Sequence, residues 1–264
     1  MRTRTSIFVL SPVLVLLGSA VDSGAAEDGA TSQFSRVRDP SFDVVFNDCH
    51  DQASIAPVSV ASVRPLVPSH YQLTDEATGT TKLVVRITTC TDIVVTGIDV
   101  GAGTVAQVGA NLVSPDGTGN INNYSFYYAS TSLLLAAHLN AIGFGAEFVP
   151  GIRFDISPDT GGNGTISIRV PQLPSPYEVG GPVVFPAAPL VAYTANWYSD
   201  FGGKTVQMHT PIPGISFGSG TMTLRTFPFD PLGRILGAGI VGFPDFDSFN
   251  YAPVTPVHVG FVTL

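Results

Sequence analysis

Amide and phenol side chains recur in three segments with the character of β-strands. They are residue types that hydrogen-bond a neutral or weakly polar small molecule. Successive side chains of a strand point to opposite faces, so alternate residues share a face. The candidate ligand-binding residues are Gln107, Asn111, Asn122, Tyr124, Tyr128, Asn196, Trp197 and Tyr198.

The segment Thr104 to Val113 shows the clearest alternation. One face is aliphatic, and the other carries Gln107, Gly109 and Asn111. If the strands on either side of SPDGTGN (114–120) pair as a hairpin, their polar faces meet and line a cavity. In the alternative, the polar face is the solvated outside of a barrel and the aliphatic face its inside. The sequence leaves both interpretations open.

Three side chains are candidates for acid/base chemistry: His138, Asp200 and Tyr128. His138 lies among leucines, where a histidine usually serves packing rather than catalysis. The five histidines include no pair at i, i+2 or i, i+4, so no metal site is expected. GISFGSG (214–220) is not a G-x-S-x-G nucleophile elbow, and the glycine-rich stretches lack the lysine of a phosphate loop, so no cofactor is expected.

Two cysteines are present, Cys49 and Cys90. In an exported chain an even pair usually forms a disulfide, which here closes a loop of about 40 residues. Such a loop stabilises the fold by roughly 3–4 kcal/mol in the chain-entropy description. A zinc site is the alternative, but two thiols without further ligands at suitable spacing make a poor one.

The N-terminus has the pattern of an export signal. Arg2 and Arg4 precede an apolar run, 7–21, and small residues follow it near Ala26. The run is shorter than a bilayer-spanning helix and contains a proline. We therefore expect residues 1–26 to be a signal peptide and the protein to be periplasmic or extracellular.

The rest of the chain suits one domain. Residues 27–40 are polar and predict a flexible segment, and residues 41–264 predict a single folded domain. The net charge is −8 with 12 Lys and Arg, and neither nucleic acid nor an anionic membrane is an expected partner, because both need clustered cations.

The composition favours strands over helices. The 28 glycines and 21 prolines separate short β-branched runs, and the chain predicts about ten strands in an antiparallel barrel or closed sandwich. Two helices interrupt them. One spans about 131–142, with Ser and Thr before it and Gly143 after it, and a short one spans about 231–237, with Asp230 as its cap.

The order of these elements resembles a known superfamily. LVP (66–68) with Tyr71 comes first, then the strand TKLVVRITTC (81–90). A tyrosine-rich strand feeds a helix that ends at Gly143, and TANWYSDFGGKTVQM (194–208) comes late. Over about residues 55–264 this resembles the acetoacetate decarboxylase-like β-barrel superfamily and exported proteins of similar type. The resemblance implies a barrel with a central, largely apolar cavity.

The resemblance also implies a test of activity. In the decarboxylases, a lysine in a Gly-x-Pro-Lys pattern after the helix forms a Schiff base with a ketoacid. Here GFGAEFVPG (143–151) stands in that place without a lysine, and Lys82 and Lys204 are the only lysines of the chain. Schiff-base chemistry is therefore not expected.

These observations favour an exported protein that binds a small apolar or weakly polar molecule in a barrel. Two other classes stay open. One is a cofactor-independent lyase, isomerase or hydrolase that uses the same cavity. The other is an extracellular structural or adhesion module with no ligand.

Overall fold

The structure, a computed structural model, describes residues 40–172 and 174–264. The predicted signal peptide, 1–26, and nearly all of the predicted flexible segment, 27–40, lie outside the described residues. Among the residues described, no helix has the length and apolar character needed to cross a lipid bilayer.

Strands dominate the described chain. They are β1 (Ser41–Ser59), β2 (Thr80–Val95), β3 (Ile98–Asp99), β4 (Gly103–Asn111), β5 (Ile121–Ser130), β6 (Ala146–Phe148), β7 (Arg153–Pro158), β8 (Asn163–Val170), β9 (Tyr177–Val184), β10 (Val191–Phe201), β11 (Lys204–Phe217), β12 (Ser219–Gly220), β13 (Thr223–Thr226), β14 (Ile240–Gly242) and β15 (Phe246–Val262). The helices are α1 (Val60–Val63), α2 (Leu133–Ala141) and α3 (Pro231–Leu236), with 3-10 turns at Arg64–Leu66 and Glu76–Thr78.

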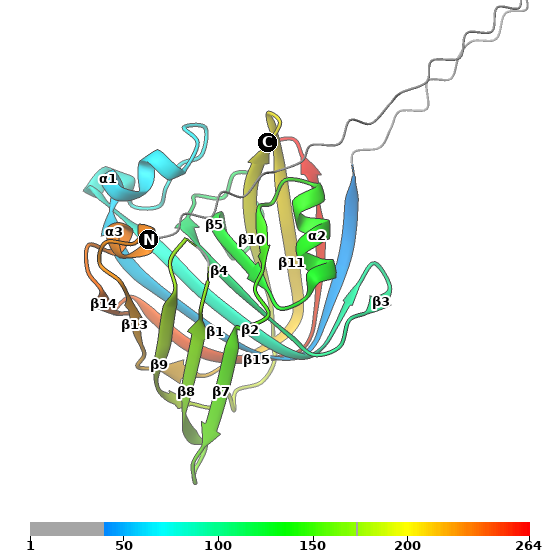
Figure 1. Cartoon of the computed structure of the whole chain (residues 1–264), viewed down its shortest axis with the longest axis vertical. Coiled ribbons are helices and arrows are strands. Elements are labelled where there is room, and N and C mark those ends of the chain that lie inside the picture. Colours follow the sequence, from blue (N-terminus) through cyan, green and yellow to red (C-terminus); the bar gives the residue numbers. More distant parts are fainter. Residues whose placement is uncertain (1–39, 173) are drawn as a thin grey trace, which may run out of the picture. The chain divides into compact units, whose positions relative to one another are not determined.

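Seven strands close into a barrel in the order β1, β15, β11, β10, β5, β4 and β2, and β2 pairs back onto β1 (Figure 1). Six of the seven pairings are antiparallel, whereas β5 and β10 run parallel. A parallel pair needs a long crossover, and residues 131–190 supply it. The predicted barrel with two helices is confirmed, but its sheet is mixed rather than wholly antiparallel.

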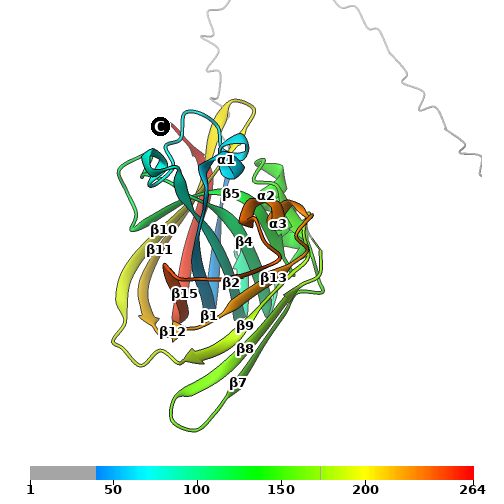
Figure 2. The same ribbon diagram turned by 90° about the vertical axis from the view of Figure 1, so that its left-hand side faces the viewer.

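The crossover contributes β7, β8 and β9 to a second sheet, which is ordered β14, β13, β9, β8 and β7, with β12 paired to β9 (Figure 1, Figure 2). Along β8, exposed and buried residues alternate strictly, and Ile166 and Ile168 are on the buried face. They join one hydrophobic cluster with Leu83 and Val85 of β2 and Val108 of β4. The second sheet therefore covers the outer face of these barrel strands.

The two predicted helices form close to the expected boundaries. Ser132 caps α2, because its Oγ accepts a hydrogen bond from the Leu135 backbone N–H at 3.3 Å. Asp230 occupies the N-cap position of α3, but its side chain makes no capping bond, contrary to expectation. Ser175 Oγ accepts from the Leu232 N–H at 2.8 Å instead. A distant hydroxyl thus does what the local carboxylate was predicted to do.

Strands β4 and β5 pair as the hairpin that the sequence allowed, and the turn is built as the sequence indicates. Gly117 and Gly119 have φ of 75° and 80°, in the left-handed region that favours glycine. Asp116 Oδ1 accepts hydrogen bonds from the backbone N–H of Thr118 at 2.9 Å and from its hydroxyl at 2.8 Å. This loop leads directly into the outer polar cluster described below.

Candidate functional site

A cavity of about 60 Å³ lies inside the barrel, between β1, β2, β5, β10, β11 and β15. Most of its wall is apolar, from Ala53, Ile55, Val84, Ile121, Ala195, Ile212, Ile215, Phe217 and Phe246. Its remaining lining residues are Asp51, Arg86, Asn123, Tyr193, Trp197 and Asn250. An apolar enclosure with a few polar groups is the usual form of a small-molecule site.

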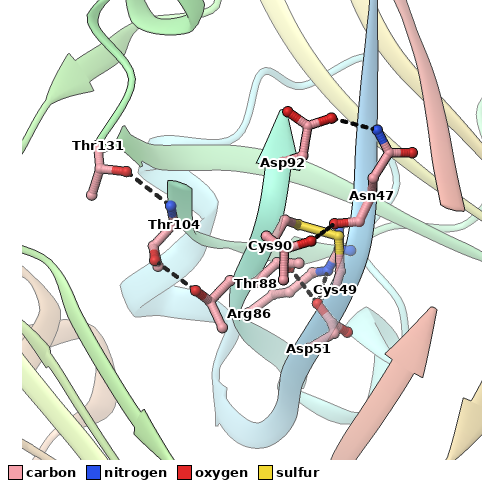
Figure 3. The surroundings of a disulfide bond; sticks show 11 residues. Asn47, Cys49, Asp51, Arg86, Thr88, Cys90, Asp92, Thr104 and Thr131 are labelled. Atoms are coloured by element: carbon pink, nitrogen blue, oxygen red, sulfur yellow. Dashed lines mark hydrogen bonds and ion pairs between the residues drawn. A yellow bond between two sulfur atoms is a disulfide. The ribbon is translucent and has the colours of Figure 1, made fainter. Parts of the chain in front are cut away.

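An ion pair forms the polar end of this cavity. Arg86 Nε lies 2.7 Å from Asp51 Oδ1, and the two side chains are only 14% and 7% exposed (Figure 3). Thr88 donates a hydrogen bond from its hydroxyl to the same carboxylate oxygen. Asn250 Nδ2 lies 3.4 Å from Asp51 Oδ2. Paired and hydrogen-bonded in this way, both charges can persist inside the barrel.

Arg86 also borders a second cavity, of about 10 Å³. Arg86 Nη1 donates a hydrogen bond to Gln107 Oε1 at 3.3 Å, and Tyr128 and Thr210 also line this second cavity. Burial raises the pKa of Tyr128, so that phenol stays protonated at neutral pH. The guanidinium therefore separates the larger cavity from a smaller one whose lining includes Gln107, Tyr128 and Thr210.

The alternation of β2 places Arg86 in the interior. Leu83 and Val85 pack outward into the core beneath the second sheet, so Val84 and Arg86 face inward. Sequence reasoning missed Arg86 and Asp51. The signal available in the sequence was the charged residue in the middle of the β-branched run TKLVVRIT. A charged side chain in the middle of a buried strand is rarely left without a partner of opposite charge.

Two buried polar atoms of residues lining the larger cavity have no hydrogen-bond partner: Trp197 Nε1 and Asn250 Oδ1. Thr210 Oγ1, in the smaller cavity, is also unpaired. Each unpaired buried group costs roughly 1–3 kcal/mol. Trp197 Nε1 is therefore an unpaired donor and Asn250 Oδ1 an unpaired acceptor, both in residues that line the larger cavity.

Gly109 lets the Trp197 ring reach its place. A Cβ added to this residue would lie 2.2 Å from Tyr124 O and 2.8 Å from Trp197 Cζ3. The strand register shifts between Val108 and Gly109, as at a β-bulge. A glycine inside a predicted strand thus marks a close approach of two strands at the cavity wall.

The predicted Cys49–Cys90 disulfide is confirmed. The two residues are direct partners in the β1–β2 ladder, with Cα atoms 4.1 Å apart. Asp51 lies two residues after Cys49 and Thr88 two residues before Cys90, and Asp51 and Thr88 are themselves register partners. The disulfide and the ion pair therefore both join β1 to β2 where the barrel closes (Figure 3).

Six of the eight predicted ligand-binding residues divide between two places. Gln107, Tyr128 and Trp197 line the interior cavities. Asn122, Asn196 and Tyr198 form an outer polar cluster together with Gln207 and Asp116. The alternation of the sequence placed Asn122 and Tyr128 on one face of β5, but they lie on opposite faces, because the strand register shifts by one residue between them. Both Asn122 and Tyr128 are buried.

Hydrogen bonds connect every member of the outer polar cluster. Asn196 Nδ2 donates to Asn122 Oδ1 at 3.1 Å, and Tyr198 OH donates to the same oxygen at 3.2 Å. Gln207 Nε2 donates to Tyr198 OH at 3.0 Å and to Asp116 Oδ2 at 2.8 Å. The cluster completes the attachment of loop 113–120 to the barrel wall.

Asn111 and Tyr124 lie apart from both sets. Asn111 Nδ2 donates to Asn123 Oδ1 at 3.1 Å, which brings it next to a lining residue of the cavity. The ring centre of Tyr124 lies 5.1 Å from that of Tyr71, and burial raises its pKa to about 12.

The remaining acid/base candidates lie outside the cavities. Asp200 accepts a hydrogen bond from Tyr71 OH at 2.8 Å and lies 3.3 Å from His70 Nε2. His138 Nδ1 contacts Leu134 O at 2.9 Å within α2, in a packing role. Of the three candidates, only Tyr128 borders the interior.

The described residues hold no group of three His, Cys, Asp or Glu side chains that could bind a metal. Neither lysine lines the interior cavities. Lys82 pairs with Asp75 at 3.3 Å, and Lys204 lies over the Phe261 ring, 5.3 Å from its centre.

Comparison with known proteins shows a shared fold. Acetoacetate decarboxylase from Legionella pneumophila matches 92% of this chain over 98% of its own, with a TM-score of 0.55 and 9% identity. A second acetoacetate decarboxylase structure matches 89% of this chain over 95% of its own, with a TM-score of 0.55 and 10% identity. No protein-family model and no curated protein matches the chain. The chain therefore has the acetoacetate decarboxylase-like barrel fold.

Proposed function

We propose that the protein binds a small, largely apolar molecule inside the barrel, and that the molecule carries one group that both donates and accepts hydrogen bonds. The observation that carries this proposal is the presence of Trp197 Nε1 and Asn250 Oδ1, both unpaired, among the residues of one apolar cavity. A hydroxyl or amide group is complementary to such a pair, whereas a hydrocarbon leaves both atoms unsatisfied.

The cavity volume limits the size of the ligand. One water needs roughly 10–15 Å³ of such space, so about 60 Å³ admits only a few non-hydrogen atoms. Short alcohols and amides are of that size. A drug-sized ligand occupies a pocket of roughly 300–1,000 Å³ and does not fit unless the walls move.

Binding accounts for the interior better than the Schiff-base chemistry of the decarboxylases does. That chemistry needs an amine in the cavity, and the only lysines, Lys82 and Lys204, have their partners elsewhere. The fold supplies a barrel interior, and the side chains within it supply an ion pair and unpaired neutral groups.

We also propose that the protein is exported. The Cys49–Cys90 disulfide supports this location, since disulfides persist in oxidising compartments. The basic residues and apolar run within residues 1–26 agree with it.

Trp197 offers a direct test, because it is the single tryptophan of the chain. Its indole ¹H–¹⁵N resonance therefore reports on this cavity alone. Titration with 1-butanol and with N-methylacetamide is expected to shift the resonance in a saturable way. Xenon, which fills an apolar space without hydrogen bonding, is expected to bind without the downfield shift of a hydrogen-bonded indole proton.

Two variants serve as a matched pair. Ala195→Leu places three further carbons in the cavity and is expected to abolish saturation, whereas Ala102→Leu, at an exposed turn, leaves it unchanged. A shift that is linear in probe concentration, or equal in wild type and Ala195→Leu, contradicts binding at this site.

A further inference from the structure

The outer face of the second sheet carries a row of charged residues across four strands. Arg153 of β7 is the register partner of Arg169 of β8, and Arg169 that of Glu178 of β9. Glu178 is in turn the register partner of Arg225 of β13. All four side chains are exposed, because the alternation that buries their neighbours against the barrel directs them to solvent.

The row contains more positive charge than its own carboxylate balances. Arg169 Nε lies 3.6 Å from Glu178 Oε1. Arg153 and Arg225 form neither ion pairs nor side-chain hydrogen bonds with any other described residue. Like charges directly opposite each other in a sheet are destabilising, and Arg153 and Arg169 are such a pair. Three arginines thus stand in one row of a chain whose net charge is −8.

A hollow of about 420 Å³ adjoins this row. Arg169, Glu178 and Arg225 form its polar side, and Tyr177, Pro171 and Phe227 are among its apolar residues. Phe227 is 64% exposed. The hollow therefore combines two guanidinium groups with an accessible aromatic ring.

The surface next to the row carries hydroxyl groups. Ser167, Gly180 and Thr223 are register partners across β8, β9 and β13 and share the exposed face of the sheet. With strands about 4.8 Å apart, the charged row extends over roughly 14 Å. A ligand that carries several negatively charged groups along its length can therefore pair with more than one arginine when it lies across the strands.

We propose that this face binds an anionic saccharide, whose carboxylate or sulfate groups pair with Arg169 and Arg225 and whose sugar ring packs against Phe227. Arginine binds such groups through paired hydrogen bonds, and the aromatic ring provides an apolar platform. The hydroxyls of Ser167 and Thr223 are available to the hydroxyls of a sugar.

Nucleic acid fits this face less well. Its binding requires many clustered cations, whereas this row supplies three arginines, and Asp155 in the neighbouring row repels an anion that does not lie along them. This site is separate from the barrel cavity, since the two share no lining residue.

The test is calorimetric titration of the intact protein with trigalacturonic acid at low salt. Galactotriose, which lacks the carboxylates, and inorganic sulfate, which lacks the sugar, are the comparison ligands. The acidic trimer is expected to bind more tightly than either, with an affinity that falls as salt is raised.

Charge-removing variants locate the site. Arg225→Gln is expected to weaken the acidic trimer about two- to fivefold, and Arg169→Gln with Arg225→Gln about tenfold. Lys82→Gln removes the same charge from an exposed ion pair elsewhere and is expected to change nothing. Equal loss in Lys82→Gln and Arg225→Gln, binding of galactotriose or sulfate as tight as that of the acidic trimer, or no binding to the wild type overturns the proposal.

Discussion

Strand β10 presents two polar environments on its opposite faces. Asn196 and Tyr198 face the outer polar cluster, where every amide and phenol named above has a hydrogen-bond partner. Trp197, between them in sequence, faces the barrel interior, where its Nε1 has none. Buried polar groups that are fully paired fix a structure, whereas an unpaired buried group costs free energy until it finds a partner.

The comparison separates paired from unpaired buried groups better than residue type does. Asparagine and tyrosine side chains occur in both places. In the outer polar cluster they hold loop 113–120 against the barrel. In the interior, the ion pair of Asp51 and Arg86 is satisfied, but the neutral groups beside it are not.

The largest effect is expected from breaking the interior ion pair. Arg86→Met leaves the Asp51 carboxylate, in a residue only 5% exposed, without its cation, and should lower the free energy of unfolding by about 3 kcal/mol. Urea denaturation of wild type and variant measures this loss. Arg86→Met combined with Asp51→Leu should recover much of it, because no uncompensated charge remains. A loss below about 1 kcal/mol for Arg86→Met alone would show that the pair is solvated.

A substitution in the outer polar cluster should lower the stability of the fold but leave binding in the barrel cavity unchanged. Asn196→Ala removes the bonds to Thr118 and Asn122 and leaves His209 Nδ1 without its partner, so unfolding should become easier by about 2 kcal/mol. The response of the Trp197 indole resonance to 1-butanol should be unchanged. Asn163→Ala, at an exposed asparagine, is the control for stability. Loss of butanol binding in Asn196→Ala would mean that the two environments are one site.

Two threonines of the interior sharpen the comparison. Thr88 donates to Asp51, whereas the hydroxyl of Thr210, in a residue only 1% exposed, has no partner. Thr88→Val should therefore destabilise the fold by about 1 kcal/mol, and Thr210→Val should be neutral or stabilise it by about 1 kcal/mol. Thermal unfolding of both variants checks this difference in sign. Equal losses would indicate that a hydrogen-bond partner, such as a bound water, satisfies Thr210 in solution.

Local patterns in the sequence were enough to predict much of the fold. The alternation of β4, the turn chemistry of 114–120 and the serine before α2 each depend on residues close together in the chain. The cap of α3 was assigned to Asp230, because no local pattern reveals a hydroxyl supplied by Ser175.

The candidate site was harder to predict for a physical reason. Alternation distinguishes the two faces of a strand but does not say what covers each one. The aliphatic face of β4 packs beneath the second sheet, and its polar face turns inward, so the interior is the more polar side of that strand. Asp51 and Arg86 meet only because β1 and β2 pair at the closure of the barrel, 35 positions apart in sequence.

The smallest predicted effect concerns the pH dependence of the outer polar cluster. Partial burial alone would raise the pKa of Asp116, but hydrogen bonds from Thr118 and Gln207 outweigh it and hold the pKa below its usual value. A carboxyl group whose pKa is lowered by folding stabilises the fold above its unfolded value of about 3.9, and this contribution disappears as the pH falls through the folded value.

The effect on stability should be small, because interactions of a surface carboxylate are screened by salt. Between about pH 5 and pH 2, the melting temperature of the wild type should therefore fall slightly more than that of Asp116→Asn. The two curves should converge at the acid end, where Asp116 is protonated, and Asp75→Asn provides a control at a carboxylate outside this cluster. Parallel curves over the whole range would mean that the hydrogen bonds to Asp116 do not favour its charged form, and loop 113–120 would then be held by the neutral amides and Tyr198 alone.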